Sequence, residues 1–274
     1  MGLITYKPTT PSFRKTVKID KSVLFKGRPE KNLVEELQPN SGRNNTGKMT
    51  VPHRGGGHKK RYRIIDFKRN KFEFFAEVKT IEYDPNRSAF ISLVEYEDGE
   101  KRYVIAQGGF KIGQKISSGE NASPEIGNAL PLSKIPLGTV ISSIELNPGA
   151  GASLARSAGA FAQLMARDGN LATIKLPSGE TRTISINCMA SIGAVSNSDH
   201  QLIVSGKAGH SRWLGRRPRT RPVAMNPVDH PMGGGEGRAS GGHPRSKNGI
   251  PAKGFRTRSK NKASNKFIIE RRKK

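Results

Sequence analysis

The sequence predicts a mainly β protein, with an OB-like barrel followed by an SH3-like barrel and long irregular basic extensions at both ends. Segments rich in Ile, Val, Phe and Tyr recur between residues 62 and 186, and short turn signals separate them. The charge distribution supports the extensions. The expected limits are 1–59 for the N-terminal arm, 60–125 and 126–200 for the two barrels, and 201–274 for the C-terminal extension.

Most of the net charge lies towards the two ends of the chain. The 274 residues include 48 Lys+Arg and 22 Asp+Glu, a formal charge of +26. Residues 1–71 carry +13, residues 72–205 carry −3 and residues 206–274 carry +16. A folded middle between strongly cationic ends indicates a nucleic-acid partner. A basic enzyme would instead be expected to carry its charge around a pocket in the folded part.

The first barrel is predicted from a run of short strands without helical interludes. Turn signals at 84–87 and 98–100 separate them. This pattern favours a five-stranded OB-like barrel. Residues 1–50 show no sustained periodicity and predict an extended arm, with one helical turn at most at 34–37. The predicted strands are Tyr62–Phe67, Phe72–Tyr83, Ala89–Tyr96 and Lys101–Gln107.

The second barrel is predicted after a connector at residues 126–136. The composition of 161–166 also suits a helix, but the turn signal at 167–170 favours a strand. A short helix is expected within 196–204. Beyond Gly206 only a turn of helix near Trp213 is expected, so deletion of 206–274 should leave both barrels folded. The predicted strands are Thr139–Leu146, Phe161–Ala166, Leu171–Leu176 and Thr181–Ile186.

Several kinds of site are disfavoured by residues that the sequence lacks. The single cysteine, Cys188, excludes an internal disulfide and a cysteine-rich zinc site, and its apolar neighbours predict burial. The histidines lack metal-ligand spacing, so no metal site is predicted. No nucleotide-binding glycine motif is present, and no cofactor is expected. The sequence has no run of 18 apolar residues, so no membrane span is predicted.

Two glycine-rich stretches stand beside cationic clusters. In 51–61, three glycines lie between Arg54 and His58, and their backbone N–H groups are expected to reach phosphate oxygens. A solvated linker is the alternative, although linkers are more usually Gly/Ser-rich and lack flanking cations. In 223–243, prolines and glycines exclude both a helix and a central strand. An external partner is therefore expected to order that stretch.

Five arginines surround the only tryptophan, Trp213, within residues 212–221. Arginine forks bind phosphates, and a base could stack on the indole. Equally, Trp213 could be a local anchor that packs Leu214 onto a barrel. The run at 256–262 has the composition of a segment that is disordered until it binds.

A catalytic site is weakly supported. Asp229 and His230 could form an oriented base with Glu236 nearby, but no serine or cysteine nucleophile is marked. An RNA-acting enzyme with His230 as general base stays the alternative to a binding protein. A regulatory or DNA-architectural protein is a third reading.

Two motifs together resemble the family of large-subunit ribosomal protein two, bacterial type: His53–Arg63 and Met225–Arg238, with Gly42–Asn45 before the first. The resemblance covers essentially the whole chain. It implies an OB-like plus SH3-like core that binds large-subunit ribosomal RNA near the peptidyl transferase region. It also implies contacts with other ribosomal proteins, a role in joining the small subunit, and a cytoplasmic or organellar ribosome. Met232 replaces a frequent second histidine, and Pro52 is a further departure.

The sequence therefore predicts a structural protein of the large ribosomal subunit, not an enzyme. His230 is interpreted as a structural residue that donates to RNA from a folded loop. The predicted RNA-binding residues are His53, Arg54, Gly55, Gly56, Gly57, His58, Lys59, Lys60, Arg61, Arg63, Lys207, His210, Arg212, Trp213, Arg216, Arg217, Arg219, Arg221, Asn226, His230, Gly233, Gly234, Gly235 and Arg238.

Overall fold

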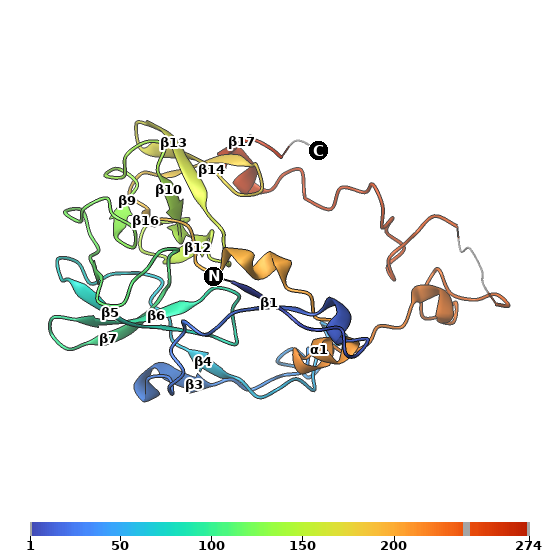
Figure 1. Ribbon diagram of the computed structural model, residues 1–274. Helices are drawn as coiled ribbons and strands as arrows, with labels where there is room; N and C mark the ends of the chain where they lie inside the picture. Colours follow the sequence, from blue (N-terminus) through green and yellow to red (C-terminus); the bar gives the residue numbers. More distant parts are fainter. Residues whose placement is uncertain (1, 238–241, 273–274) are drawn as a thin grey trace. The chain divides into compact units, whose positions relative to one another are not determined.

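The computed structural model describes residues 2–237 and 242–272. The chain is mainly β, as predicted, and it divides into two compact units (Figure 1). Unit 1 contains Met1–Gln38, Lys59–Ala208 and Lys266–Lys274, and it holds both sheets of the predicted barrels. Unit 2 contains Pro39–His58 and Gly209–Asn265. The predicted limits of the four regions stay predictions.

The first barrel of unit 1 is built on a four-stranded antiparallel sheet of order β7-β6-β5-β8. Alternate residues such as Val78, Val94 and Val104 point into one apolar cluster, as the period of two along a strand requires. The predicted turn at 98–100 is confirmed, since the Tyr96 N–H donates to the Glu100 carbonyl at 2.9 Å. The strands are β5 (Ala76–Glu82), β6 (Ile91–Tyr96), β7 (Lys101–Ile105) and β8 (Lys115–Ile116).

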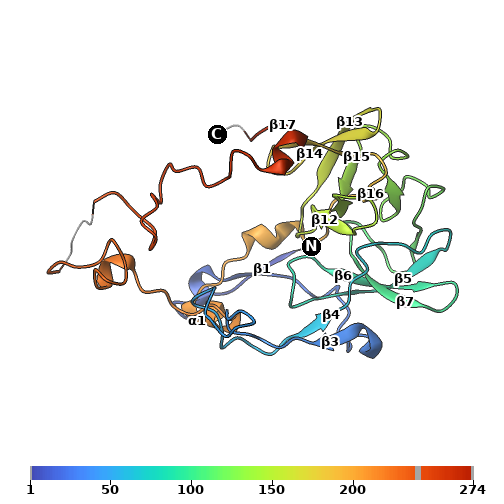
Figure 2. The ribbon, with the colours of Figure 1, turned by 180° about the vertical axis from the view of Figure 1, so that it is seen from behind.

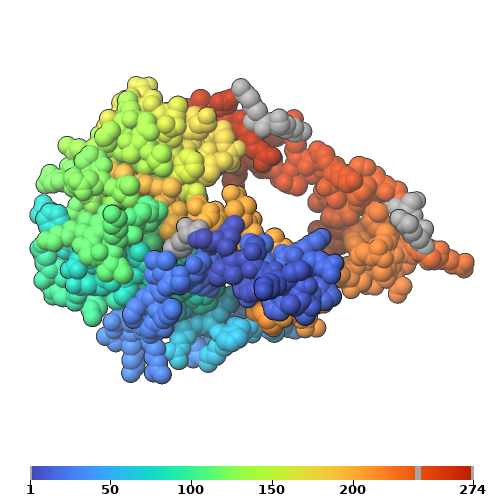
Figure 3. Space-filling view, viewed as in Figure 1, coloured from blue at the N-terminus to red at the C-terminus, as the bar shows by residue number. Residues whose placement is uncertain are grey.

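The N-terminal region of unit 1 has more regular structure than the sequence predicted. The predicted helical turn at 34–37 is wrong: β3 (Val34–Glu36) is a strand that pairs with β4 (Arg61–Arg63). β1 (Leu3–Thr5) pairs with β2 (Val17–Ile19), and residues of this region form part of the surface in Figure 3. Ile19 and Leu24 are nevertheless buried in the core of the first barrel. Short 3₁₀ turns are η1 (Phe13–Lys15) and η2 (Lys31–Leu33).

The second barrel contains a seven-stranded sheet of order β17-β15-β14-β13-β10-β16-β9 (Figure 2). The segment 161–166, whose composition also suited a helix, forms a strand from Ala162 onwards as expected, because β13 pairs with β14 along its length. The hairpin between β14 and β15 is also confirmed, with Gly179 at φ +84° in its turn. The main strands are β10 (Val140–Ser142), β13 (Ala162–Asp168), β14 (Leu171–Lys175), β15 (Thr181–Ser185) and β16 (Met189–Ile192).

Three strands of this sheet were not predicted: β16, which follows Cys188, and two shorter strands, β9 and β17. β9 (Ala129–Pro131) lies inside the predicted connector and pairs with β16. β17 (Ile268–Glu270) comes from the C-terminal extension and pairs with β15. The prediction that no strand of either barrel lies in 206–274 is therefore wrong. β9 and β17 have only three residues each, too few to show the alternation of a strand in the sequence. They form because a neighbouring strand supplies hydrogen bonds.

The remaining elements are short. β11 (Ile144–Glu145) pairs with β12 (Ala152–Leu154). The helix expected within 196–204 is the 3₁₀ turn η3 (Ser198–Leu202), and the helical turn near Trp213 is α1 (Ala208–Trp213). In the described part of the chain, no helix is long and apolar enough to cross a membrane. The other 3₁₀ turns are η4 (Pro222–Ala224) and η5 (Ala263–Phe267).

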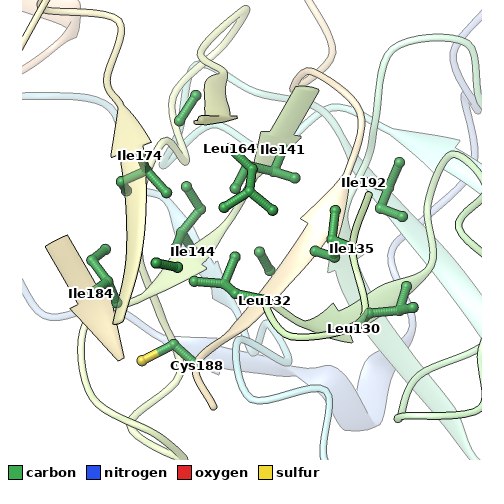
Figure 4. Packing of buried hydrophobic residues seen from close by; sticks show 13 residues of the cluster. Leu130, Leu132, Ile135, Ile141, Ile144, Leu164, Ile174, Ile184, Cys188 and Ile192 are labelled. Atoms are coloured by element: carbon green, nitrogen blue, oxygen red, sulfur yellow. The ribbon is translucent and has the colours of Figure 1, made fainter. Parts of the chain in front are cut away.

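The core of the second barrel is a cluster of aliphatic side chains from all of its main strands (Figure 4). Ile141, Leu164 and Ile174 are fully buried there. Cys188 is also fully buried, which confirms the prediction for this residue. The apolar surface removed from water stabilises the barrel by about 25 cal/mol per Å².

A buried arginine joins the two barrels inside unit 1. Arg69 donates from Nε to the Ser118 hydroxyl at 3.0 Å, and from Nη2 to the carbonyls of Ser117 and Gly127. Ser118, which accepts one of these hydrogen bonds, also forms a parallel β-bridge with Ala129. The three acceptors satisfy a guanidinium that would otherwise be costly to bury.

Candidate nucleic-acid interface

Unit 2 concentrates positive charge. Its two segments contain sixteen Lys+Arg and two Asp+Glu, whereas unit 1 contains thirty-two and twenty. Unit 2 thus joins the two glycine-rich stretches that the sequence singled out, although they lie more than 150 residues apart. A compact unit with so few carboxylates presents a strong field to an anionic partner.

The first segment of unit 2 contains a turn that the Asn44 side chain holds in place. The Asn44 Oδ1 accepts from the N–H groups of Thr46 and Lys48 at 3.1 and 2.9 Å. This turn brings Arg43 opposite Met49 in an antiparallel bridge. Asn is favoured here because its short amide can hydrogen-bond to the following backbone.

The second segment begins with α1 and turns sharply at Gly215. The Gly215 N–H donates to the Arg212 carbonyl at 2.9 Å, and the Arg216 N–H donates to the Ser211 carbonyl at 3.0 Å. Gly215 has φ +80°, a conformation that glycine adopts without strain at the end of a helix. The helix itself ends at Trp213, just before this turn.

The two segments of unit 2 pair along their backbones. The Gly55 N–H donates to the Gly215 carbonyl, and the Arg217 N–H donates to the His53 carbonyl, both at 3.0 Å. The His58 N–H donates to the Trp213 carbonyl, also at 3.0 Å. The Gly55 N–H, one of the glycine N–H groups expected to reach phosphates, is therefore used inside the protein. We call this pairing of 53–58 with 213–217 the backbone clasp.

A groove of about 690 Å³ lies along the backbone clasp. Four arginines line it, and the described part of the chain contributes no Asp or Glu to its lining. His53, also in the lining, has φ +62°, a left-handed conformation that costs a residue other than glycine about 1 kcal/mol or more. The groove is suited to an anion. Its arginines are Arg43, Arg54, Arg212 and Arg217.

The aromatic residue of this region is open to solvent. Trp213 is 55% exposed and Leu214 is 50% exposed, so neither is packed as a hydrophobic anchor. The His210 ring meets the indole edge-on, with centroids 5.9 Å apart. Of the two roles left open by the sequence, the exposure favours the stacking surface. Arg216, Arg219 and Arg221 are exposed as well.

Other predicted RNA-binding residues belong to unit 1. Lys59 forms an ion pair with Glu36 at 2.6 Å, and this contact lowers the pKa of the Glu36 carboxyl. Lys60 precedes β4, while Arg61 and Arg63 lie on it. Lys207, also in unit 1, is exposed.

His230 is held inside the loop that follows η4. It is only 7% exposed, and its Nδ1 accepts from the Met232 N–H at 3.0 Å. The Asn226 carbonyl accepts from the N–H groups of Asp229 and His230. No hydrogen bond joins the Asp229 carboxylate to the imidazole within the described residues. The loop is thus closed by its own groups, although the sequence suggested that only a partner could order it.

The glycines of this loop allow its two backbone segments, around residues 225–226 and 233–234, to lie in close contact. A Cβ on Gly233 would lie 2.4 Å from the Met225 carbonyl oxygen and 2.6 Å from that of Asn226. The Gly234 N–H donates to the same Met225 carbonyl at 3.1 Å. Gly235 follows with φ +96°. The predicted site residue Arg238 lies outside the described residues.

One of the four groove arginines was missed by the sequence analysis. Arg43 lines the groove with Arg54, but it was quoted only as part of the family resemblance. The turn-forming Asn44 and Gly47 beside it were the available signal. In the described part of the chain, no group of three His, Cys, Asp or Glu could hold a metal ion.

Comparison with family models places both parts of the chain. Residues 30–118 match the RNA-binding N-terminal domain of ribosomal proteins L2, and residues 125–249 match their C-terminal domain. The chain belongs to the L2 family of ribosomal proteins. The resemblance in the two glycine-rich motifs is thereby confirmed.

Full-length L2-family relatives agree. Large ribosomal subunit protein uL2 of Flavobacterium psychrophilum is 68% identical over 274 residues, which is all of both chains. The protein of the same name from Parabacteroides distasonis is 61% identical over the same length. That from Salinibacter ruber is 56% identical over 273 residues, 99% of this chain and 96% of its own. An L2-family chain is a structural ribosomal protein, so the enzyme alternative is not supported.

Proposed function

We propose that this L2-family chain binds large-subunit ribosomal RNA through the arginine-lined groove of unit 2. The observation that carries the proposal is the convergence of Arg43, Arg54, Arg212 and Arg217 on one groove to which the described residues contribute no carboxylate. Guanidinium groups form two parallel hydrogen bonds with a phosphate, and they stay charged at every physiological pH. The groove therefore binds the sugar–phosphate backbone.

The arrangement suits folded RNA better than a base sequence. RNA duplexes are recognised largely by shape, phosphates and 2′-hydroxyls, whereas unpaired bases stack on exposed aromatic rings. Arginines of the groove bind phosphates, and the exposed Trp213 accepts an unpaired base beside them. Residues 242–262, which follow an extended course in Figures 1 and 2, reach additional phosphates.

The RNA site is proposed to lie near the peptidyl transferase region, and the chain to support association with the small subunit in a cytoplasmic ribosome. The family resemblance supports this placement. Light scattering of mixed large and small subunits tests the proposed support of subunit association. Large subunits that carry groove variants, once assembled, should associate with small subunits more slowly.

The RNA-binding proposal is tested by salt dependence. The full chain is titrated with large-subunit ribosomal RNA between about 50 and 200 mM salt, and the log–log slope should be about −0.7 to −0.9 per neutralised phosphate. Replacing Arg43, Arg54, Arg212 and Arg217 by Gln should make the slope shallower by about 3.

A matched control removes equal charge from the slightly acidic middle of the chain. Lys111, Lys115, Lys134 and Lys175 are exposed in unit 1, and their replacement by Gln should leave the slope nearly unchanged. Equal losses in both quadruple variants would show that binding follows net charge and not the groove. A flat salt response of the native chain would reject the proposal altogether.

A further inference from the structure

Unit 1 contains a second concave surface, between its two barrels, that differs in chemistry from the groove of unit 2. It has a volume of about 1110 Å³. Phe72 and Phe75 line it from the segment before β5, and Ala122 lines it from the loop after β8. Pro131 of β9 and Met189 of β16 complete its apolar lining from the second barrel. We call it the inter-barrel cleft.

The phenylalanines of the inter-barrel cleft are exposed, although the sequence predicted them within a strand. Phe72 is 48% exposed and Phe75 is 52% exposed, because the strand begins only at Ala76. Between them, Glu73 has φ +68°, which is strained for a residue other than glycine. The backbone is thus bent so that two large rings stand at a concave surface. Exposed apolar groups with a polar rim mark interaction sites.

The charges at the cleft are of the opposite sign to those of the whole chain. Its exposed charged residues are Lys68, Glu73 and Glu120, in a protein of net charge +26. Glu145 also lines it, but this carboxylate is buried and accepts from the Gly149, Gly151 and Met189 N–H groups. Two exposed carboxylates against one lysine repel a phosphate backbone and attract a cation.

We propose that the inter-barrel cleft binds a polypeptide segment of another ribosomal protein, rich in Lys or Arg and carrying an aromatic or aliphatic anchor. The anchor packs between Phe72 and Phe75, and its basic neighbours meet Glu73 and Glu120. Phe and Met are enriched at protein interfaces, and a few buried anchors supply most of the binding energy. The inference uses the proposed function only in placing the chain within a ribosomal particle.

Base stacking on the same phenylalanines is the competing reading. A stacked nucleotide would bring its phosphate close to the rim, where Glu73 and Glu120 are exposed. In unit 2 the exposed ring, Trp213, stands instead beside arginines. The charge around each aromatic site therefore separates a protein-binding site from an RNA-binding one.

Photo-cross-linking in purified large subunits tests the proposal. A benzophenone analogue of phenylalanine replaces Phe75 in one variant and Phe74 in the other. Phe74 is a matched control because it is 43% exposed in the same segment but does not line the cleft. The Phe75 probe should yield one dominant adduct with a Lys- or Arg-rich peptide of another ribosomal protein, at several times the yield of the Phe74 probe.

Charge reversal provides the second arm. Glu73→Lys combined with Glu120→Lys should reduce that adduct at least about fivefold, because like charges then face each other. The same variant should keep the native salt slope for ribosomal RNA, which separates failure of this proposal from failure of the proposed function. An adduct with ribosomal RNA overturns the proposal. So does a yield equal to that of the Phe74 probe, or a captured peptide without basic residues.

Discussion

The backbone of Gly57 lies against the backbone of Gly215. A Cβ on Gly57 would stand 2.8 Å from the Gly215 nitrogen and 2.9 Å from its Cα, closer than non-bonded atoms approach. The atoms in the way are backbone, so no side chain can rotate aside. Gly57 itself is not in the left-handed region. Alanine is therefore excluded at this position by contact alone.

Gly57→Ala should separate the two segments of the backbone clasp and scatter the groove arginines. We expect affinity for large-subunit ribosomal RNA to fall about tenfold, or about 1.4 kcal/mol. The melting of unit 1 should not change. Gly209→Ala is the control, because Gly209 lies in α1 and, beyond the neighbouring helix backbone, no described atom lies within 4 Å of a methyl added there. It should bind as the native chain does, and equal losses in both variants would exclude a role for the clasp.

The C-terminal strand should stabilise the second barrel. β17 pairs with β15, and the Thr183 hydroxyl donates to the Phe267 carbonyl at 3.4 Å. Deleting 266–274 removes these hydrogen bonds and exposes the edge of the sheet, at a cost of about 1–3 kcal/mol. Thermal unfolding of the full chain and of the deletion measures the loss. Deletion of 271–274 keeps β17 and should leave the melting temperature unchanged; equal melting of all three proteins would refute the role.

Strands that show their own period were predictable from the sequence. β6, β14 and β15 alternate or carry a clear turn signal, so local pattern was enough. β9 and β17 have three residues each, and their conformation depends on β16 and β15. Such strands exist only through tertiary pairing, which a single segment does not show.

The candidate interface was predictable in composition but not in geometry. Clustered arginines and glycines identify polyanion-binding segments whatever their fold. The contact of Gly57 with Gly215 joins two backbones without side chains, so neither sequence pattern nor charge could indicate it. The same reason explains why Arg43 was not grouped with Arg212 and Arg217.

Cys188 should make stability depend on alkaline pH. Burial and the nearby Glu145 carboxylate raise the pKa of its thiol from 9.0 to about 11. The unfolded thiol ionises first, so its contribution to stability is complete below pH 9 and decreases as the pH rises towards 11. The stability difference between the native chain and Cys188→Ala, measured by urea unfolding, should therefore narrow over this range.

The reactivity of the same thiol provides a direct check. At about pH 8 the native chain should react with a thiol reagent only after addition of denaturant, because only the thiolate of an accessible cysteine attacks. Rapid labelling of the folded protein, or a stability difference independent of alkaline pH, would contradict the assignment of Cys188 to the core.

His230 should act as a structural residue whose Nδ1 holds the loop. Because Nδ1 accepts the Met232 N–H, the ring proton must lie on Nε2. The only basic lone pair of the ring, on Nδ1, is therefore already used in a hydrogen bond. A general base needs an unoccupied basic nitrogen directed at its substrate. The Nε2–H group remains a donor, which fits a contact with RNA.

Two amide substitutions separate the structural role from catalysis. In His230→Asn the side-chain oxygen can replace Nδ1 as acceptor, whereas in His230→Gln the amide lies one methylene further out. We expect Asn to be incorporated into large subunits nearly as well as His, and Gln to be incorporated several-fold less. Asp229→Asn is the control and should change nothing. Peptide synthesis per assembled particle should stay within about twofold in all three, since general-base loss would cost about 10²–10⁴-fold. Normal assembly of both His230 variants with such a loss of peptide synthesis would instead identify His230 as a general base.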